Sequence, residues 1–236
     1  YVQLHDAYLS VAEALQHGGI ANNAKVNIKW VNSENLENPD EIFKDVDGII
    51  LPGGFGGRGV EGMIQTAGYA RKKGIPYLGI CLGMQIAAIS FARDVLGLAD
   101  ANSFEFDEKT PNTIIDFMEN QSNEIQKGGT MRLGAYPCQV HMDTLLYDLY
   151  QQELIDERHR HRYEFNNRFR DDFEAAGMKI SGTSPDQTLV EAIEFTDHPF
   201  YVGVQYHPEF KSRPNKAHPL FTGLIKASLE HPAESR

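Results

Sequence analysis

Residues 79–83 place one nucleophilic side chain between two glycines. The segment reads Gly79-Ile80-Cys81-Leu82-Gly83, follows a strand-like run at 75–78 and precedes a helix-like stretch at 84–96. A G-x-nucleophile-x-G pattern at a strand-to-helix junction is typical of a nucleophile elbow, and a helix N-terminus favours the thiolate form of a cysteine. We therefore predict that Cys81 is the nucleophile of a covalent mechanism. The alternative is a buried structural cysteine, which is common for free thiols but does not account for the flanking glycines.

His207 and Glu209 are the best candidates for the base and the orienting acid that a cysteine nucleophile needs. They follow a strand-like segment at 200–205, and residues i and i+2 of a strand point to the same side. Pro208 between them favours extended backbone at His207. This spacing predicts that the Glu209 carboxylate binds one imidazole nitrogen while the other faces the sulfur. The alternative is a surface histidine beside a solvated glutamate.

A glycine-rich loop at 53–59 is the candidate oxyanion site. In a nucleophile elbow, one donor is the backbone N–H of the residue after the nucleophile, here Leu82, and the second comes from a loop after a neighbouring strand. Gly54 brings its N–H close because no side chain stands in the way. The rival interpretation is a phosphate-binding loop, but the sequence at 53–59 has neither the G-x-G-x-x-G nor the G-x-x-x-x-G-K-[ST] pattern.

The composition is that of an ordinary globular protein, with 236 residues, 41% hydrophobic residues and a net charge of -11. No run approaches the roughly 18 apolar residues that a membrane helix needs, so we expect no membrane partner. An acidic surface repels phosphate backbones, which argues against nucleic acid. Cys81 and Cys138 form no CxxC or zinc pattern, so we expect no metal site and no disulfide. These features fit a reducing, cytoplasmic setting, with Cys138 as a structural thiol.

Strand-like and helix-like segments alternate through much of the chain, which predicts an α/β fold. We expect one domain over 1–236, with a mostly parallel central sheet, helices on both faces and the elbow at Cys81. The segment 119–130 is expected to be a mobile loop or lid. Helices are expected at 7–17 (ending at Gly18-Gly19), 41–44, 60–73, 84–96, part of 143–154, 168–176 and 220–230, and strands at 26–31, 47–52, 75–80, 112–118, 131–141, 178–182, 189–195 and 200–205.

The run 158–162 alternates arginine and histidine. Alone, it could bind nucleic acid or phosphates, or hold a metal through its histidines. If the run is a strand, Arg158, Arg160 and Arg162 face one side and the two histidines face the other. Because the whole chain is acidic, we interpret the run as one wall of a site together with structural contacts.

The motifs together resemble the class I glutamine amidotransferase family, and more specifically the glutaminase domain of CTP synthases. The resemblance covers nearly the whole chain. The general motifs are Pro52-Gly53-Gly54, the segment 79–85 and His207-Pro208-Glu209. The more specific segments are 53–59, 128–134 and 158–167, which read GGFGGRG, GGTMRLG and RHRHRYEFNN.

The resemblance implies hydrolysis of L-glutamine to glutamate and ammonia by a Cys81, His207 and Glu209 triad through a glutamyl-thioester. It implies an oxyanion hole formed by the N–H groups of Gly54 and Leu82. It also implies that glutamine is held by Gly54, Phe55, Gln85, Glu105 and Arg162. An arginine suits the α-carboxylate because its planar guanidinium matches a carboxylate.

The resemblance also implies partners outside this sequence. This domain needs no cofactor of its own, whereas the full-length enzyme uses ATP, Mg²⁺ and UTP in a synthetase domain that receives the ammonia and makes CTP, in pyrimidine biosynthesis. GTP is expected to activate the glutaminase step, with Arg58 and Arg132 as its contacts. The full-length enzyme is expected to be a homotetramer and the isolated domain a monomer.

The synthetase domain and its phosphate-binding loop are absent from this sequence, and the first strand is expected to be cut short before Tyr1. We therefore expect an excised C-terminal part of a longer chain, with weak glutaminase activity that GTP does not stimulate. Two alternatives stay open at this point. One is another class I glutaminase or a γ-glutamyl hydrolase. The other is a non-catalytic regulatory module that keeps the triad.

Overall fold

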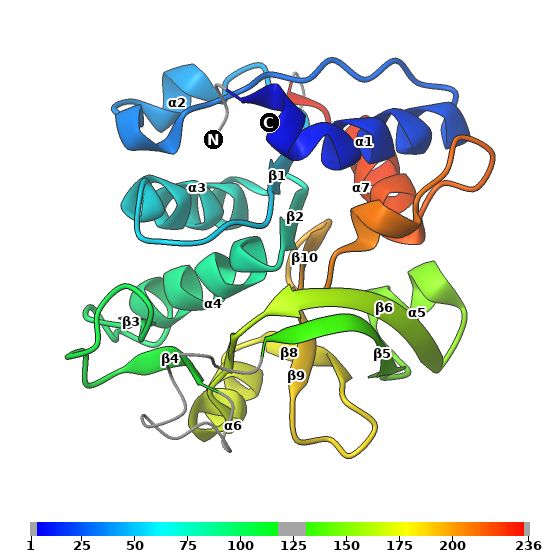
Figure 1. Ribbon diagram of the computed structural model, residues 1–236. Coiled ribbons are helices and arrows are strands. Elements are labelled where there is room, and N and C mark those ends of the chain that lie inside the picture. Colours follow the sequence, from blue (N-terminus) through cyan, green and yellow to red (C-terminus); the bar gives the residue numbers. More distant parts are fainter. Residues whose placement is uncertain (1–3, 118–130, 234–236) are drawn as a thin grey trace.

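A seven-stranded sheet runs through the centre of the molecule in the computed structural model, which describes residues 4–117 and 131–233 (Figure 1). The first three strands are parallel to one another, and each later neighbour is antiparallel to the one before it. In spatial order the strands are β1 (Ile49–Leu51), β2 (Tyr77–Ile80), β10 (Tyr201–Val204), β9 (Val190–Phe195), β8 (Met178–Thr183), β5 (Arg132–Val140) and β6 (Leu154–His161).

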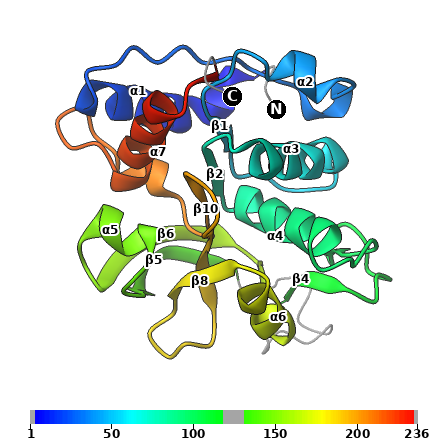
Figure 2. The same ribbon diagram turned by 180° about the vertical axis from the view of Figure 1, so that it is seen from behind.

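Helices cover both faces of the parallel part of the sheet (Figures 1 and 2). On one face, α3 (Val60–Lys73) and α4 (Leu82–Asp94) share an apolar cluster with Tyr77 and Tyr201. On the other, α1 (Leu9–Ala21) and α7 (Pro219–Glu230) share a second cluster with Leu78 and Val202. Adjacent strand residues thus enter opposite cores, as the two-residue period of a strand requires.

A smaller sheet lies beside α4 and is formed by β3 (Asn102–Ser103), β4 (Thr113–Phe117) and β7 (Tyr163–Phe165). Strands β4 and β7 are antiparallel, with Ile115 opposite Phe165. The turn at Arg162 therefore takes the chain from β6 of the large sheet into β7 of the small one. The short elements are α2 (Pro39–Ile42), α5 (Leu145–Tyr150), α6 (Arg170–Ala175) and the 3₁₀-helices His5–Tyr8, Ser33–Asn35, Asn167–Phe169 and Pro208–Lys211.

The α/β class with helices on both faces is confirmed, and the predicted helix at 60–73 has the predicted bounds. The mostly parallel sheet is corrected to a mixed one, because only the pairs β1–β2 and β2–β10 are parallel. Strands β8, β9 and β10 follow one another through loops of a few residues, which can join only antiparallel neighbours. The strand expected at 112–118 forms at Thr113–Phe117, and the loop or lid expected at 119–130 lies outside the described residues.

The predicted helix end at Gly18-Gly19 is wrong, because α1 continues through both glycines to Ala21. These glycines serve close packing instead. A Cβ on Gly18 would lie 2.7 Å from the carbonyl oxygen of Phe221 in α7. Glycine here lets α1 and α7 approach each other closely.

The predicted strand at 26–31 is also wrong, since this segment has no regular secondary structure. A cavity of about 600 Å³ is lined by this segment on one side and by Ile49, Ile50 and Leu51 of β1 on the other. Among the described strands, β1 pairs only with β2 and has no ladder with this segment.

None of the described helices combines the length and apolar character that a membrane crossing requires. Within the same residues, no three or more His, Cys, Asp or Glu side chains are grouped so that they could hold a metal ion.

Candidate active site

Cys81 occupies the single residue between the end of β2 and the start of α4. Its backbone has φ 53° and ψ -104°, a conformation that a non-glycine residue adopts only at an energetic cost. The backbone N–H of Cys81 donates to the carbonyl of Val204 at 2.7 Å, which ties the elbow to the neighbouring strand β10. The structure thus confirms the strained strand-to-helix turn that the flanking glycines predict.

The two flanking glycines are required by backbone packing. A Cβ on Gly79 would lie 2.5 Å from the carbonyl carbon of Gly83, and a Cβ on Gly83 would lie 2.1 Å from the carbonyl oxygen of Leu51. Distances this short cannot be relieved by moving a flexible side chain, because the opposing atoms belong to the backbone. The elbow therefore holds Cys81 against both β1 and β2.

His207 and Glu209 are brought together, but the strand geometry predicted for them is wrong. Strand β10 ends at Val204, and Pro208 begins a 3₁₀-helix that contains Glu209. Within this tight turn the Nδ1 of His207 and the Oε1 of Glu209 lie 2.7 Å apart. The backbone N–H of His207 donates to the carbonyl of Arg158 at 2.8 Å, so strand β6 also fixes the histidine. Both side chains are buried.

The second imidazole nitrogen, Nε2 of His207, is buried and makes no hydrogen bond among the described residues. Burial by itself lowers the pKa of His207, but the neighbouring Cys81 and Glu209 favour the imidazolium more strongly and raise the pKa to about 10. A Cβ on Gly53 would lie 2.7 Å from Cε1 of His207 and 3.5 Å from Cβ of Cys81, so the same small space borders both groups. The raised pKa therefore favours the charged form of His207 beside the sulfur.

This pairing predicts a pH-dependent stability. Because its pKa is raised from 6.5 to about 10, the contribution of His207 to the free energy of unfolding is complete below about pH 6.5 and is lost as pH rises through 10.

Replacing Cys81 with Ala removes one of the two groups that raise the pKa of His207, so we expect the titration midpoint of His207 in this variant to fall toward neutral pH. NMR titration of its imidazole C–H signal measures this shift, and an unchanged midpoint in Cys81→Ala would contradict the pairing.

The predicted oxyanion donors lie next to each other. A Cβ on Gly54 would be 3.3 Å from Cδ2 of Leu82, so the glycine loop reaches the start of α4. Leu82 is the first residue of α4, where backbone N–H groups have no partner within the helix and the helix dipole favours negative charge. The positions of both residues are consistent with the predicted role, which itself stays a prediction.

Three of the residues predicted to bind glutamine, Phe55, Glu105 and Arg162, lie on the glycine loop or interact with its neighbours. Phe55 is exposed, and the guanidinium of Arg160 lies over its ring at 5.8 Å. Glu105 accepts a hydrogen bond from the backbone N–H of Gly56 at 2.9 Å. Burial raises the pKa of Glu105, while the Gly56 hydrogen bond and the positive charge of Arg162 lower it. Arg162 is exposed and acts electrostatically on Glu105, so opposite charges border the glycine loop.

Gln85, on the second turn of α4, is buried. Its side-chain amide donates to the carbonyl of Tyr163 and to Oε1 of Gln205, both at 3.2 Å. Gln205 in turn donates to the sulfur of Cys81 at 3.7 Å. Gln205 is not among the residues predicted from the sequence, although a polar residue directly after the apolar run 200–204 is a signal that could have indicated it.

The alternation predicted for residues 158–162 is confirmed, because side chains along β6 are exposed and buried in turn. The arginines at 158 and 160 face outward. His159 and His161 face the interior, where Nδ1 of the first and Nε2 of the second lie 2.7 Å apart. Burial, followed by the charge of Arg132, lowers the pKa of His159 to about 2 and that of His161 to about 3.

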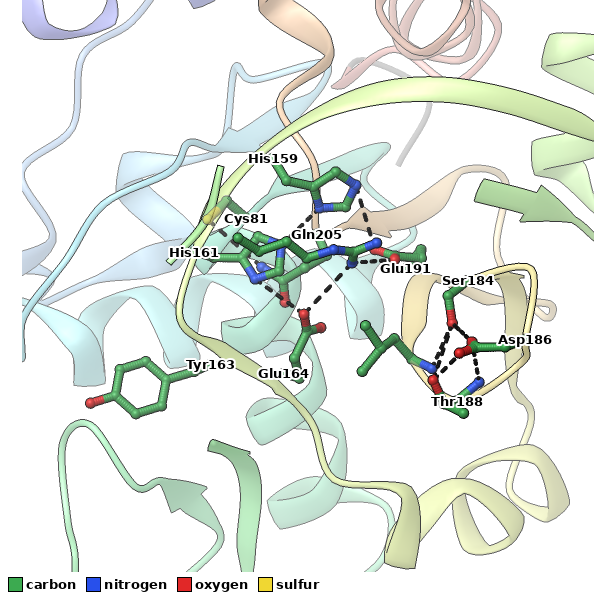
Figure 3. A network of polar contacts seen from close by, with 12 residues as sticks. Cys81, His159, His161, Tyr163, Glu164, Ser184, Asp186, Thr188, Glu191 and Gln205 are labelled. Atoms are coloured by element: carbon green, nitrogen blue, oxygen red, sulfur yellow. Dashed lines mark hydrogen bonds and ion pairs between the residues drawn. The ribbon is translucent and has the colours of Figure 1, made fainter. Parts of the chain in front are cut away.

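Arg132 lies inside the protein beside two buried glutamates. These glutamates also approach the two histidines, with Glu191 3.7 Å from His159 and Glu164 3.4 Å from His161 (Figure 3). The guanidinium of Arg132 pairs with Glu191 and lies 3.7 Å from Glu164. Burial raises the pKa of both carboxyls, and Arg132 opposes that shift. The other predicted GTP contact, Arg58, is exposed and pairs with Glu34 at 3.0 Å. The two arginines thus lie in different environments, and their predicted role stays a prediction.

A cysteine at a strand-to-helix elbow beside a histidine–glutamate pair is an arrangement typical of hydrolases and transferases of acyl groups. The sequence matches the family described as glutamine amidotransferase class-I over residues 3–227, and the chain belongs to that family. Within the family it corresponds to the glutamine-hydrolysing domain of CTP synthases, as the following similarities show.

The chain is 60% identical over 232 residues to the CTP synthase of Clostridium beijerinckii, covering 98% of this chain and 43% of that protein. It is 58% identical over 233 residues to the CTP synthase of Ruminiclostridium cellulolyticum, with coverage of 98% and 43%. The chain therefore spans less than half the length of these curated relatives.

Solved structures agree with this assignment. The glutaminase domain of Trypanosoma brucei CTPS, solved with bound acivicin, superposes with a TM-score of 0.91 at 36% identity and covers 98% of this chain and 91% of that one. A putative GMP synthase subunit from Thermoplasma acidophilum shares only the fold, with a TM-score of 0.60 at 16% identity and coverage of 89% and 85%.

Proposed function

We propose that this domain hydrolyses L-glutamine to glutamate and ammonia with Cys81 as nucleophile, His207 as acid and base, and Glu209 as the group that orients His207. The observation that carries the proposal is the strained cysteine elbow beside a buried histidine whose other nitrogen is 2.7 Å from a glutamate. We treat 1–236 as one catalytic domain.

In the first half-reaction, the Cys81 sulfur attacks the side-chain amide carbon of glutamine and forms a C–S bond. Negative charge develops on the amide oxygen, where the N–H groups of Gly54 and Leu82 stabilise it. The amide nitrogen takes a proton from Nε2 of His207, the C–N bond breaks, and ammonia leaves a glutamyl-thioester. A histidine that is charged in the resting site is ready to give this proton.

In the second half-reaction, His207 is neutral and accepts a proton from a water molecule that attacks the thioester carbonyl. The C–S bond breaks, glutamate is released, and the thiolate and the imidazolium are restored. Glu209 holds the imidazole ring through Nδ1 in both steps, which keeps Nε2 directed at the reacting atoms.

A zwitterionic substrate requires partners of both signs near the elbow. We assign Arg162 to the α-carboxylate, and Glu105 and Gln85 to the α-amino end, with Gly54 and Phe55 lining the pocket. The exposed Arg162 and the half-buried Glu105 border the glycine loop, which supports this division.

We further propose that the released ammonia serves a synthetase domain that aminates UTP to CTP with ATP and Mg²⁺ in a cytoplasmic, tetrameric full-length enzyme. Support comes from the names of the relatives, which are more than twice as long as this chain. Activation by GTP through Arg58 and Arg132 belongs to the same proposal. For Arg132, contact with GTP requires its guanidinium to leave the buried glutamates.

Covalent labelling with acivicin tests the proposed nucleophile. We expect one acivicin-derived adduct on Cys81, protection by excess glutamine, and no adduct on the fully buried Cys138. Peptide mass spectrometry reads both sites in one digest. Labelling of Cys138 with Cys81 unmodified would exclude the proposed site, and a non-catalytic module with a closed pocket would show neither adduct nor glutamate release.

A further inference from the structure

Three side chains form a continuous polar path from the small sheet to the nucleophile. The carbonyl of Tyr163 in β7 accepts from Nε2 of Gln85, which also donates to Oε1 of Gln205. The Nε2 of Gln205 lies 3.7 Å from the sulfur of Cys81 and donates to it. Figure 3 shows Gln205 and Cys81 in one cluster with the buried histidines.

The hydrogen-bonding capacity of each group fixes the direction of this path. The Tyr163 carbonyl can only accept, so Gln85 must present its NH₂ group to it. The same NH₂ group faces Gln205, which must therefore present its carbonyl oxygen. The NH₂ group of Gln205 is then left for the sulfur. A backbone carbonyl in β7 thus determines that the group at Cys81 is a donor.

The path is closed to solvent along its length, since Gln205 has 0% exposure and Gln85 and Cys81 each have 3%. Donors shielded from water interact more strongly with a developing charge than exposed ones. The backbone of Gln205 is also anchored, because its N–H donates to the carbonyl of Glu191 at 2.8 Å.

The sulfur has an acceptor as well as a donor. The carbonyl oxygen of Arg160 lies 3.8 Å from the Cys81 sulfur, so a protonated thiol donates to it. A thiolate has no proton to donate and accepts from Gln205 instead. The two neighbours therefore favour different protonation states of the same atom.

We propose that Gln205 is a further catalytic residue, whose side-chain amide stabilises the Cys81 thiolate as the nucleophile and again as the leaving group when the thioester breaks down. Gln85, at the predicted glutamine pocket, holds Gln205 in the orientation that this requires. The inference rests on the proposed role of Cys81 as nucleophile, but its test reads the sulfur directly and does not depend on turnover.

The test measures how the rate of Cys81 alkylation by iodoacetamide depends on pH. It uses the 236-residue chain, and the adduct is quantified on the peptide that contains Cys81. Gln205→Met keeps the length of the side chain and removes the donor. We expect the midpoint of alkylation to rise by about one pH unit, which is the effect of losing a hydrogen bond to a charged group. For glutamine hydrolysis, kcat is expected to fall about 10- to 100-fold with a smaller change in KM.

Gln205→Glu supplies a second measurement, because a carboxylate still accepts from Gln85 but places negative charge beside the sulfur. We expect its alkylation midpoint to rise at least as far as that of Gln205→Met. The matched control is Gln139→Met, which changes a half-buried amide on β5 and is expected to leave the profile unchanged.

An unchanged alkylation midpoint in both Gln205 variants would overturn the assignment, and so would an equal shift in Gln139→Met. Failure of the proposed function gives a different result. In that case Cys81→Ala retains glutamate release, whatever the alkylation profile of the Gln205 variants.

Discussion

Cys81→Ala is expected to abolish glutamine hydrolysis, with a loss in kcat of roughly 10⁴-fold or more, because removing the nucleophile of a catalytic triad leaves only binding and oxyanion stabilisation. The methyl group of alanine cannot form the thioester, and His207 loses the sulfur with which it is paired. Glutamate release, measured with an enzyme-coupled assay at saturating glutamine, gives the rate. The fold should persist, since alanine fits the same backbone position.

Cys138→Ala is the matched control for this experiment. Cys138 is the second free cysteine, has 0% exposure and lies in the core that contains Leu146 and Ala192. Its burial raises the pKa of its thiol well above the ordinary range, so it is a poor nucleophile. We expect full activity and a loss of stability of about 1 kcal/mol. Comparable rates in Cys81→Ala and Cys138→Ala would rule out the proposed mechanism.

The elbow could be predicted from the sequence because its determinants are local. Two glycines around a nucleophile, at the junction of an apolar strand and a helix, restrict the chain to a tight turn whatever surrounds it. The helix Val60–Lys73 was predictable for the same reason, since Gly59 and Gly74 take left-handed conformations at its two ends.

Features that depend on distant partners were not predictable. The backbone N–H of His207 donates to the carbonyl of Arg158, and the chain then forms a 3₁₀-turn at Pro208 where a strand had been expected. Gly18-Gly19 resembles a helix end until α7 is packed against it. The orientation of the Gln205 side chain depends on its hydrogen bond with Gln85, which lies 120 positions earlier in the chain. One sequence does not encode such pairings in any local pattern.

The interior position of Arg132 also depends on distant partners, and we expect its replacement to destabilise the fold strongly. Arg132 begins β5, and its guanidinium reaches Glu191 of β9 and approaches Glu164 of β7. All three side chains are nearly inaccessible to water. Arg132→Met keeps the apolar stem and leaves two buried carboxylates without their cation. We expect a loss of about 3–5 kcal/mol in the free energy of unfolding at pH 7.5, the usual result of removing one partner of a buried pair.

The size of this loss should depend on pH in a defined direction. Burial already raises the pKa of Glu164 and Glu191, and Arg132 lowers it, so removing Arg132 raises both values further. A carboxyl whose pKa is higher in the folded than in the unfolded state binds more protons in the folded state. The loss of folding stability that its buried charge causes therefore becomes smaller as pH falls. His159 and His161, whose pKa values Arg132 helps to depress, also become easier to protonate. The stability gap between variant and parent should therefore narrow at pH 5.0.

Urea unfolding at pH 7.5 and 5.0 measures the loss of unfolding free energy in Arg132→Met and its dependence on pH. The matched control is Arg58→Met. Arg58 also pairs with a glutamate, but its side chain is 68% exposed, so its removal should cost no more than about 1 kcal/mol. If Arg132→Met were as stable as Arg58→Met, an apolar side chain would replace the buried arginine without loss, and the prediction would be wrong. An equal gap at both pH values would show that the loss arises from packing and not from the unpaired carboxylates.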